Sequence, residues 1–346
     1  MKQKDVKYLI IGALILIIFI ISQGLQEKEV ERIIFIKGVS FVSPRHQIFP
    51  SHLEPVKAIG ANYVAVIPYA MSNPEKASLI FDHQKQWYGE KVKGTVEIIN
   101  AARMQGLQIM LKPHVWVRGQ GWAGDLRFEK ETQWLQWEND YLEYLKIYLK
   151  VADSLKVEMF CIGTEMRHFV TERPEFFQEI INVCRKSYSG RLTYAANWDN
   201  YNNVKFWDQL DFIGIDAYFP LSENKHPTVK ELKTEWKPIQ KDLQKLSDKL
   251  HKPVVFTEYG YRSVDYSTLG HWNATGEEKI NHNLQKDAYQ ALYQTFCDRP
   301  WFAGGFLWKW FPNHAEAGGV LDSKYTPQNK PAEQLIKDWF HKKNAM

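Results

Sequence analysis

From residue 33 onward, short apolar runs alternate with longer segments in which apolar residues recur every three to four positions. Short runs bounded by Gly, Pro, Asn and Asp are typical of buried strands, and the longer amphipathic segments are typical of helices. We predict eight strands, at residues 33–41, 62–69, 107–114, 157–165, 191–197, 211–218, 254–260 and 302–310. The predicted helices cover residues 51–59, 95–105, 134–152, 174–186, 207–210, 229–250 and 279–297, and a last helix begins at Pro331.

Eight strands that alternate with helices are typical of an α/β protein with the (β/α)8 TIM-barrel fold, in which parallel strands close into a ring. No internal repeat and no phosphate loop of the GxxxxGK type occurs. We therefore predict a single catalytic domain at residues 33–342. Two predicted loops, residues 70–94 and 261–278, are long for simple connections, and we expect them to carry functional residues.

The first 24 residues have a different pattern from the rest of the chain. Lys2, Lys4 and Lys7 precede an apolar run of 14 residues, 8–21. This length is short for a membrane span and suits an export signal, although the lysines would also hold an uncleaved anchor. Because no clear small-x-small cleavage site follows, we favour a signal anchor over a cleaved signal peptide. We expect residues 1–24 to direct the domain to the periplasmic or extracellular face.

Composition and charge narrow the class of ligand. The 13 Trp, 17 Tyr and 19 Phe form a large aromatic set, and many lie beside Gly, Asn and Asp in sequence typical of loops. This favours a ligand that stacks on aromatic rings, such as a sugar or a base. The formal charge of +4 arises from 44 basic and 40 acidic side chains that are well mixed, which makes nucleic acid an improbable partner.

Two glutamates are the strongest candidates for chemistry. Glu165 and Glu258 each end an apolar predicted strand, where a carboxylate either caps a neighbouring loop or serves function. The two glutamates are 93 positions apart, which equals three strand–helix units of about 31 residues and fits an eightfold barrel of ~250 residues. The pair is therefore predicted on the fourth and seventh strands, facing one mouth of the barrel.

Alternation along the strands predicts further side chains at the same mouth. These are Tyr69, Lys112, His114, Asp216, Tyr218, Trp308 and Trp310. His114 is either a sugar-binding residue or a core histidine, and Lys112 either neutralises a carboxylate or contacts substrate. Asp216 is predicted to be a buried hydrogen-bonding group. Trp116 and Trp122 are separated by glycines, so we expect a loop to present them as stacking platforms.

This set of residues suits the hydrolysis of a glycosidic bond. One carboxylic acid can protonate the leaving oxygen while a second carboxylate attacks the anomeric carbon, and aromatic side chains hold the sugar rings. The three cysteines, Cys161, Cys184 and Cys297, are widely spaced and odd in number. We interpret them as small buried hydrophobic residues, and we expect no metal site and no cofactor.

Several short motifs together resemble glycoside hydrolase family 113, a family of clan A of the retaining glycosidases. The motifs are Gly163-Thr164-Glu165, residues 211–220, residues 256–261 and residues 305–310, with residues 37–41 and 325–331 also similar. The resemblance covers nearly the whole chain after Lys37. It implies a TIM barrel, a double-displacement mechanism and endo-β-1,4-mannanase activity on mannan or manno-oligosaccharides.

The resemblance also implies roles for individual residues. Glu165 corresponds to the general acid/base, Glu258 to the nucleophile, and Tyr218 to the hydroxyl that steadies the nucleophile. Trp308 corresponds to the tryptophan that forms the floor of the −1 sugar subsite.

One position departs from the pattern of the clan. The clan usually has Asn before the acid/base, where it contacts the sugar 2-hydroxyl, whereas this chain has Thr164. Recognition of an axial 2-hydroxyl must then come from elsewhere, and we consider Asn197 or Trp198, at the end of the fifth predicted strand, to be candidates. Other clan A activities on glucan, xylan or galactan therefore remain alternatives.

Two other classes of function are open at this point. A metal-dependent lyase could use Glu165, Asp216 and Glu258 as Mg²⁺ ligands. A carbohydrate-binding protein without catalysis could keep the aromatic residues but would not need both glutamates. The expected partner is a β-linked polysaccharide or oligosaccharide, with membrane contact only through residues 1–24, and we expect a monomer.

The predicted anchor leads to a first testable expectation. Because all the predicted strands and helices lie downstream, deletion of residues 1–24 should leave a folded enzyme whose glycosidase activity equals that of the full chain. Circular dichroism and release of reducing sugar measure the two properties. Loss of folding on deletion would show that the segment is part of the structure.

Overall fold

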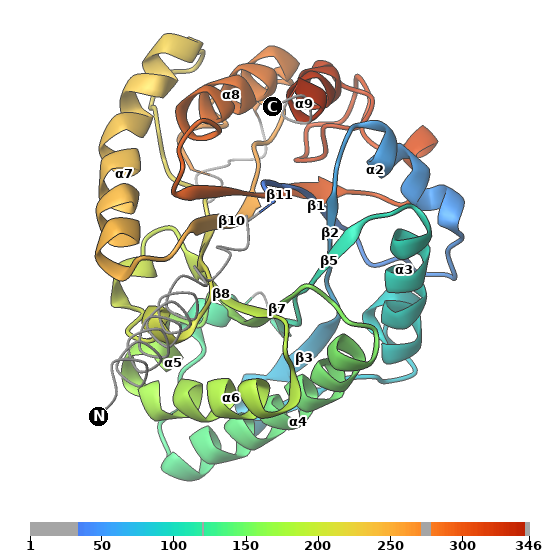
Figure 1. Ribbon diagram of the computed structural model, residues 1–346, viewed down its shortest axis with the longest axis vertical. Coiled ribbons are helices and arrows are strands. Elements are labelled where there is room, and N and C mark those ends of the chain that lie inside the picture. Colours follow the sequence, from blue (N-terminus) through green and yellow to red (C-terminus); the bar gives the residue numbers. More distant parts are fainter. Residues whose placement is uncertain (1–33, 120, 271–277, 343–346) are drawn as a thin grey trace, which may run out of the picture. The chain divides into compact units, whose positions relative to one another are not determined.

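The computed structural model describes residues 34–119, 121–270 and 278–342. Eight parallel strands close into a barrel in the order β1-β11-β10-β9-β8-β7-β5-β2, as Figure 1 shows. Their bounds are β1 Ile36–Phe41, β2 Tyr63–Val66, β5 Gln108–Leu111, β7 Met159–Thr164, β8 Arg191–Asn197, β9 Ile213–Asp216, β10 Val254–Tyr259 and β11 Phe302–Trp310. The predicted (β/α)8 barrel is confirmed.

Helices surround the ring of strands (Figure 1). They are α2 Glu54–Ala58, α3 Val92–Met104, α4 Glu131–Ser154, α5 Arg167–Glu172, α6 Pro174–Ser187, α7 Val229–Leu250, α8 His282–Phe296 and α9 Pro331–Lys342. Short 3-10 turns are η1 Pro50–Leu53, η2 Pro74–Lys76, η3 Tyr88–Glu90, η4 Ala123–Asp125, η5 Tyr201–Asn203, η6 Trp207–Gln209 and η8 His314–Glu316. Most of these helices begin or end within a few residues of the predicted bounds, since caps and proline positions mark them in the sequence.

The interior of the barrel is a packed apolar core. The buried residues that form it are Ile36, Tyr63, Ala65, Ile67, Met110, Met159, Phe212, Val255, Ala303 and Phe306. Tyr69 and Trp308 are only partly buried and pack against this cluster. The two aromatic side chains therefore rest on the filled barrel and are available at one of its mouths.

Two predicted strands are each divided by a proline. Residues 62–69 contain β2 and the start of β3 (Tyr69–Asn73), with Pro68 between them, and residues 107–114 contain β5 and the start of β6 (His114–Val117), with Pro113 between them. Proline lacks the N–H that a strand ladder needs, which explains both interruptions. The expectation of two continuous strands was wrong.

The chain beyond these prolines forms a second, smaller sheet. Its strand order is β4-β3-β6, where β4 is Ser78–Ile80; β3 and β6 are parallel, and β3 and β4 are antiparallel. The predicted loop 70–94 thus contains two strands. Trp116 lies on β6 and not on a loop, because its backbone pairs in register with Met71 of β3.

The aromatic face of α4 is core, as its helical spacing predicts. Trp134, Trp137 and Tyr141 are buried, and the rings of Trp137 and Tyr141 stack with centroids 5.0 Å apart. The Trp137 indole nitrogen also donates to the Ser72 hydroxyl of β3, 3.0 Å away. Helix α4 therefore holds the small sheet beside the barrel.

A bulge in β11 separates two tryptophans that were expected to share a face. Between Val39 and Phe41 of β1, the partner residues on β11 advance from Leu307 to Trp310, so β11 carries one extra residue. An extra residue reverses the alternation of side chains beyond it. Trp308 is partly exposed at the mouth, whereas Trp310 is fully buried, and the expectation that both lie at the mouth was wrong.

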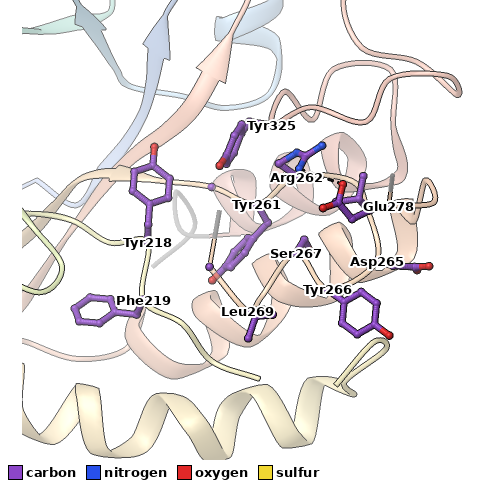
Figure 2. Close-up of a pocket in the computed structure, with 13 residues that line it drawn as sticks. Tyr218, Phe219, Tyr261, Arg262, Asp265, Tyr266, Ser267, Leu269, Glu278 and Tyr325 are labelled. Carbon is purple, nitrogen blue, oxygen red and sulfur yellow. Dashed lines mark ion pairs between the residues drawn. The ribbon is translucent and has the colours of Figure 1, made fainter. Parts of the chain in front are cut away.

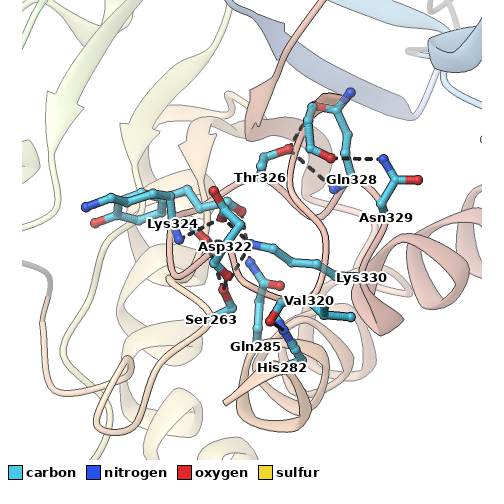
Figure 3. A network of polar contacts seen from close by, with 12 residues as sticks. Ser263, His282, Gln285, Val320, Asp322, Lys324, Thr326, Gln328, Asn329 and Lys330 are labelled. Atoms are coloured by element: carbon cyan, nitrogen blue, oxygen red, sulfur yellow. Dashed lines mark hydrogen bonds and ion pairs between the residues drawn. The ribbon is translucent and has the colours of Figure 1, made fainter. Parts of the chain in front are cut away.

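Buried polar contacts connect the loops that follow β10 and β11 (Figure 3). The Lys330 ammonium donates to the Ser263 hydroxyl at 2.9 Å, to the Asp322 carboxylate at 2.6 Å and to the Lys324 carbonyl at 3.0 Å. From α8, the Gln285 amide donates to the carbonyls of Tyr261 and Tyr325, each at 2.9 Å. Residues at the mouth are thereby held by groups more than 20 positions away in the chain.

The three cysteines are free thiols in the core of the domain. Cys161, Cys184 and Cys297 are all buried, as predicted. In the part of the chain that the structure describes, no helix has the length and apolar character of a membrane span. The predicted anchor, residues 1–24, lies outside the described residues.

Lys330 offers a test of the contacts between the loops. Lys330→Met should lower the free energy of unfolding by about 2–3 kcal/mol, because Asp322 and the Lys324 carbonyl lose their buried donor. Urea unfolding followed by circular dichroism measures this. The control Lys337→Met, which removes an exposed lysine of α9, should change it by less than about 0.5 kcal/mol. Equal effects of the two variants would contradict the proposed role of Lys330.

Candidate active site

Glu258 lies near the carboxyl end of β10 and is held by two donors. Only 5% of its surface is exposed. The Tyr218 hydroxyl donates to Oε2 at 2.8 Å, and the Lys112 ammonium donates to Oε1 at 2.5 Å. The two hydrogen bonds fix the orientation of the Glu258 carboxyl group. The predicted contact between Tyr218 and Glu258 is confirmed.

Lys112 follows β5 and is fully buried, so its charge needs partners. Besides Glu258, its ammonium contacts Asp216 Oδ1 at 3.2 Å, and Asp216 also accepts from the Thr257 hydroxyl at 2.7 Å. Burial opposes the charge of Lys112, but the Asp216 and Glu258 carboxylates outweigh it and raise the pKa of the ammonium. Of the two roles open for Lys112, the structure shows neutralisation of carboxylates. It also confirms Asp216 as a buried hydrogen-bonding group.

Glu165 immediately follows β7 and adopts the left-handed backbone region, with φ of 53°. This conformation costs a non-glycine residue of the order of 1 kcal/mol and persists only where neighbours enforce it. Strand β8 does so, because the Glu165 N–H donates to the Ala195 carbonyl at 2.7 Å. The next N–H, of Met166, donates to the Tyr194 hydroxyl at 2.8 Å. The turn directs the Glu165 side chain away from the regular alternation of the strand.

The surroundings of Glu165 favour its protonated form. Burial, followed by the negative charges of Asp216 and Glu258, raises the pKa of Glu165 to about 8. Two interactions oppose this rise: a hydrogen bond from the Trp122 indole nitrogen, 2.5 Å from Oε2, and the positive charge of Lys112. At neutral pH one glutamate can therefore donate a proton while the other is held by an ammonium and a hydroxyl. This difference suits an acid and a nucleophile.

A cleft of about 670 Å³ opens at Trp308 and Tyr69, and neither Glu165 nor Glu258 is among the residues that line it. Its lining includes Trp308 and Lys309 of β11, Tyr69 and Met71 of β3, Trp116 of β6, and Trp87 and Arg118. Trp87 and Trp116 expose 42% and 58% of their surface, which leaves their rings accessible to a ligand. A concave site with several accessible aromatic rings suits a chain of sugars.

His114 begins β6 and packs against Tyr69, with ring centroids 5.1 Å apart. Burial and the Lys112 charge lower the pKa of His114 to about 4, so the imidazole is neutral at physiological pH. Its Nδ1 atom is buried and has no hydrogen-bond partner among the residues that the structure describes. Contact between His114 and a sugar remains a prediction.

Asn197 and Trp198, the candidates for recognition of a 2-hydroxyl, lie at the end of β8. Asn197 is opposite Asp216 in the strand register, and its amide donates to the Asp199 carboxylate at 2.8 Å. The Trp198 ring meets the edge of Phe219, with centroids 5.9 Å apart. Asn197 is the last residue of β8, which pairs with β7, and Trp198 follows it; their contact with substrate remains a prediction.

A second, smaller pocket borders Tyr218, the hydroxyl donor to Glu258 (Figure 2). Its volume is about 30 Å³, and Tyr218, Phe219, Tyr261 and Tyr325 are among the residues that line it. An ion pair between Arg262 and Glu278, at 3.6 Å, closes part of its wall. The pocket has room for about one water molecule, which is less than a sugar ring needs.

The position of Lys112 bears on the metal-dependent alternative. A lyase of that class would use Asp216 and Glu258 as ligands, but the Lys112 ammonium occupies the space between their oxygens. Among the described residues, no group of three or more His, Cys, Asp or Glu side chains is arranged to hold a metal ion.

Sequence reasoning missed several residues at the site. Arg118 and Lys309 line the cleft, and Arg167 lies over the Trp122 ring, 5.0 Å from its centroid. Trp87 falls within the predicted loop 70–94, which was expected to carry functional residues, but it was not itself predicted. Lys309 directly follows Trp308, and its place beside a predicted mouth residue could have identified it as a cleft residue. Arg167 has no feature in the sequence that distinguishes it from a surface arginine.

The charge cluster of Lys112, Asp216 and Glu258 predicts a coupled response to mutation. Lys112→Met should lower the free energy of unfolding by about 3–5 kcal/mol, because two buried carboxylates lose their cation. Adding Asp216→Asn should restore part of that loss, since one unpaired charge is removed. Urea unfolding of the two single variants and the double variant measures the coupling.

A surface ion pair provides the control for this cycle. Lys146→Met removes an exposed lysine that pairs with Glu143 at 2.8 Å, and it should cost less than about 1 kcal/mol. If the double variant Lys112→Met/Asp216→Asn loses as much stability as the sum of the two single variants, the cluster does not act as a unit.

The family model of glycoside hydrolase family 113 matches residues 46–330 of the chain. Among solved structures, the GH113 β-mannanase AaManA from Alicyclobacillus acidocaldarius, in complex with ManMIm, is 25% identical with a TM-score of 0.78. That comparison covers 90% of this chain and 98% of that one. A complex of a GH113 β-1,4-mannanase is 27% identical with a TM-score of 0.75, covering 89% of this chain and 99% of that one.

A more distant structure, the β-glucuronidase of Faecalibacterium prausnitzii, is 15% identical with a TM-score of 0.60, and it shows the fold alone. It covers 89% of this chain and 49% of that one. The comparison with curated protein sequences found no match. Because the family model covers most of the chain, including both strand-end glutamates, this protein belongs to glycoside hydrolase family 113 and is a glycoside hydrolase that acts on a glycan.

Proposed function

We propose that this glycoside hydrolase is a retaining endo-β-1,4-mannanase that cleaves mannan or manno-oligosaccharides by double displacement. Two solved structures similar to this chain are β-mannanases, at 25% and 27% identity. The observation that carries the proposal is the pair of glutamates at the carboxyl ends of β7 and β10, which lie in different electrostatic surroundings. A retaining mechanism requires that difference, because one carboxyl group must be protonated while the other attacks.

In the first step, Glu258 is the nucleophile and Glu165 is the general acid. Tyr218 and Lys112 orient the Glu258 carboxylate for attack on the anomeric carbon. The raised pKa of Glu165, about 8, keeps its proton available for the leaving glycosidic oxygen at neutral pH. A C–O bond forms to Glu258 as the glycosidic C–O bond breaks, and the leaving sugar departs with the proton.

In the second step, Glu165 is the general base. The charge of Glu258 is lost while it is esterified, so one of the two charges that raise the pKa of Glu165 is absent. The ionised Glu165 can then accept a proton from water as the water attacks the anomeric carbon. Glu258 leaves as a carboxylate, and Lys112 and Tyr218 again supply its two donors.

The aromatic residues of the cleft bind the sugar chain in this proposal. Trp308 forms the floor beneath the sugar that is attacked, and Trp116 with Tyr69 extends the surface along the small sheet. Asn197 or Trp198 recognises the axial 2-hydroxyl that distinguishes mannose from glucose. We also propose that residues 1–24 export and anchor the enzyme, which suits a substrate outside the cell.

A panel of polysaccharides tests the substrate. The enzyme should release reducing sugar from mannan faster than from xylan, cellulose or galactan, and ¹H NMR should show that the first product has the β configuration. Endo action predicts oligosaccharides of mixed length at early times. A preference for another glycan would change the substrate assignment, and an α product would overturn retention.

Variants of the two glutamates test their roles. Glu258→Gln should lower kcat by about 10⁴-fold or more on every substrate, since an amide cannot attack the anomeric carbon. Glu165→Gln should lower mannan hydrolysis by about 10²–10⁴-fold but spare the first step on an aryl β-mannoside with a good leaving group. Azide should then accelerate only the Glu165→Gln variant, giving a β-mannosyl azide.

The outcome that contradicts the assignment is specific. Rescue of Glu258→Gln by azide with retained β configuration, or full activity of Glu165→Gln on mannan, would show that the roles are exchanged or absent. The wild-type enzyme, assayed with and without azide, is the control for non-specific effects of the anion.

A further inference from the structure

The contact between Trp122 and Glu165 is not explained by stacking on a sugar. Trp122 lies in the loop between β6 and η4, and its indole nitrogen donates to Glu165 Oε2. One face of its ring is covered by the Arg167 guanidinium, 5.0 Å from the ring centroid. The indole is therefore engaged at its nitrogen and on one face before any ligand binds.

The chemistry of indole makes this bond directional. The indole N–H is a donor and never an acceptor, so Oε2 must offer a lone pair in both protonation states of Glu165. In a neutral carboxyl group the carbonyl oxygen is a stronger acceptor than the hydroxyl oxygen, so this bond favours the form of protonated Glu165 that carries its proton on Oε1.

The surrounding residues fix the indole in place. Arg167, which covers the ring, is itself paired with Asp125 at 2.6 Å. Gly124 lies against the ring, and a Cβ atom added there would stand 2.4 Å from the Trp122 Cη2 atom. Only glycine leaves room for the ring in this position, because real Cβ atoms do not approach so closely.

We propose that Trp122 is a positioning residue for Glu165: it holds Oε2, leaves Oε1 as the oxygen that donates and accepts the proton, and stabilises the ionised carboxylate. Arg167 and Gly124 act through Trp122 by fixing the indole. The inference rests on the proposed role of Glu165 as acid/base. Trp122 then acts in both steps of the reaction. In the first step it orients the protonated Glu165, and in the second step its indole N–H stabilises the ionised Glu165 that serves as the base.

Charged and titratable groups from several elements also act on Glu165. Asp216 of β9 and Glu258 of β10 oppose its ionisation, and Lys112, after β5, favours it. The negative charge of Glu165 also contributes, after burial, to raising the pKa of the Tyr194 hydroxyl of β8. Because these groups remain in place in a Trp122 variant, the change in Glu165 isolates the contribution of the indole.

The test measures the titration of Glu165 directly. Full-length protein labelled with [δ-¹³C]glutamate is titrated by ¹³C NMR, and Glu165→Gln identifies the resonance. Trp122→Phe should raise the pKa of Glu165 by about one unit, because the ring is kept while a hydrogen bond to the charged form is lost. Gly124→Ala, which displaces the ring but keeps the indole, should raise it in the same direction.

Trp116→Phe is the matched control. It alters another tryptophan of the same region, one that is 58% exposed in the cleft, and it should leave the Glu165 titration unchanged. An unchanged Glu165 pKa in Trp122→Phe, or an equal shift in Trp116→Phe, would overturn the inference. This readout needs no substrate, so it stands apart from any failure of the mannanase assignment.

Kinetics provide the second readout. The basic limb of kcat/KM in the wild type should lie near the Glu165 pKa of about 8. In Trp122→Phe this limb should move up by about one unit, and kcat at neutral pH should fall about tenfold or more while KM changes little. A sugar platform would instead raise KM and leave the limb in place, and that result would overturn the positioning role.

Discussion

The active site depends on one buried ammonium. Three carboxylates, Glu165, Asp216 and Glu258, meet at the mouth of the barrel, and Lys112 contacts two of them directly. Without this cation, the burial of several negative charges in one place would be unfavourable. The Lys112 ammonium interacts differently with the two glutamates. It donates a hydrogen bond to Glu258. Glu165 instead accepts from the Trp122 indole, and Lys112 acts on it only through its positive charge. The two glutamates therefore differ in the donors that hold their carboxyl groups.

The backbone reinforces that difference. Glu258 belongs to β10 and lies in register with Asp216, so its side chain meets Lys112 and Tyr218 across neighbouring strands. Glu165 stands one residue beyond β7 in a left-handed turn, which β8 holds through the Ala195 carbonyl and the Tyr194 hydroxyl. A barrel brings such strand ends to one face whatever their distance along the chain. Two residues of the same type thereby acquire different hydrogen-bond partners.

The small sheet β4-β3-β6 forms part of the wall of the 670 Å³ cleft. Pro68 and Pro113 end β2 and β5, and the chain then pairs again as β3 and β6 outside the ring. This second pairing places Trp116 beside Met71 and brings Tyr69 against His114. A wall made of strands holds aromatic side chains more firmly than a free loop can, which reduces the entropy lost when a sugar chain binds.

The sequence by itself determined the eight strands, most of the helices and the two strand-end glutamates. Hydrophobic period, proline and cap residues are local signals, and strand ends are visible within a few residues. The family resemblance added the expected contact between Tyr218 and Glu258. Only the tertiary structure decided that Lys112 joins Glu258, 146 residues away, and that Trp122 joins Glu165, 43 residues away. It also decided that Trp308 and Trp310 differ in exposure, because a bulge leaves no local mark in the sequence. Such contacts depend on which strand ends and loops the closed barrel brings together, and no local pattern contains that information.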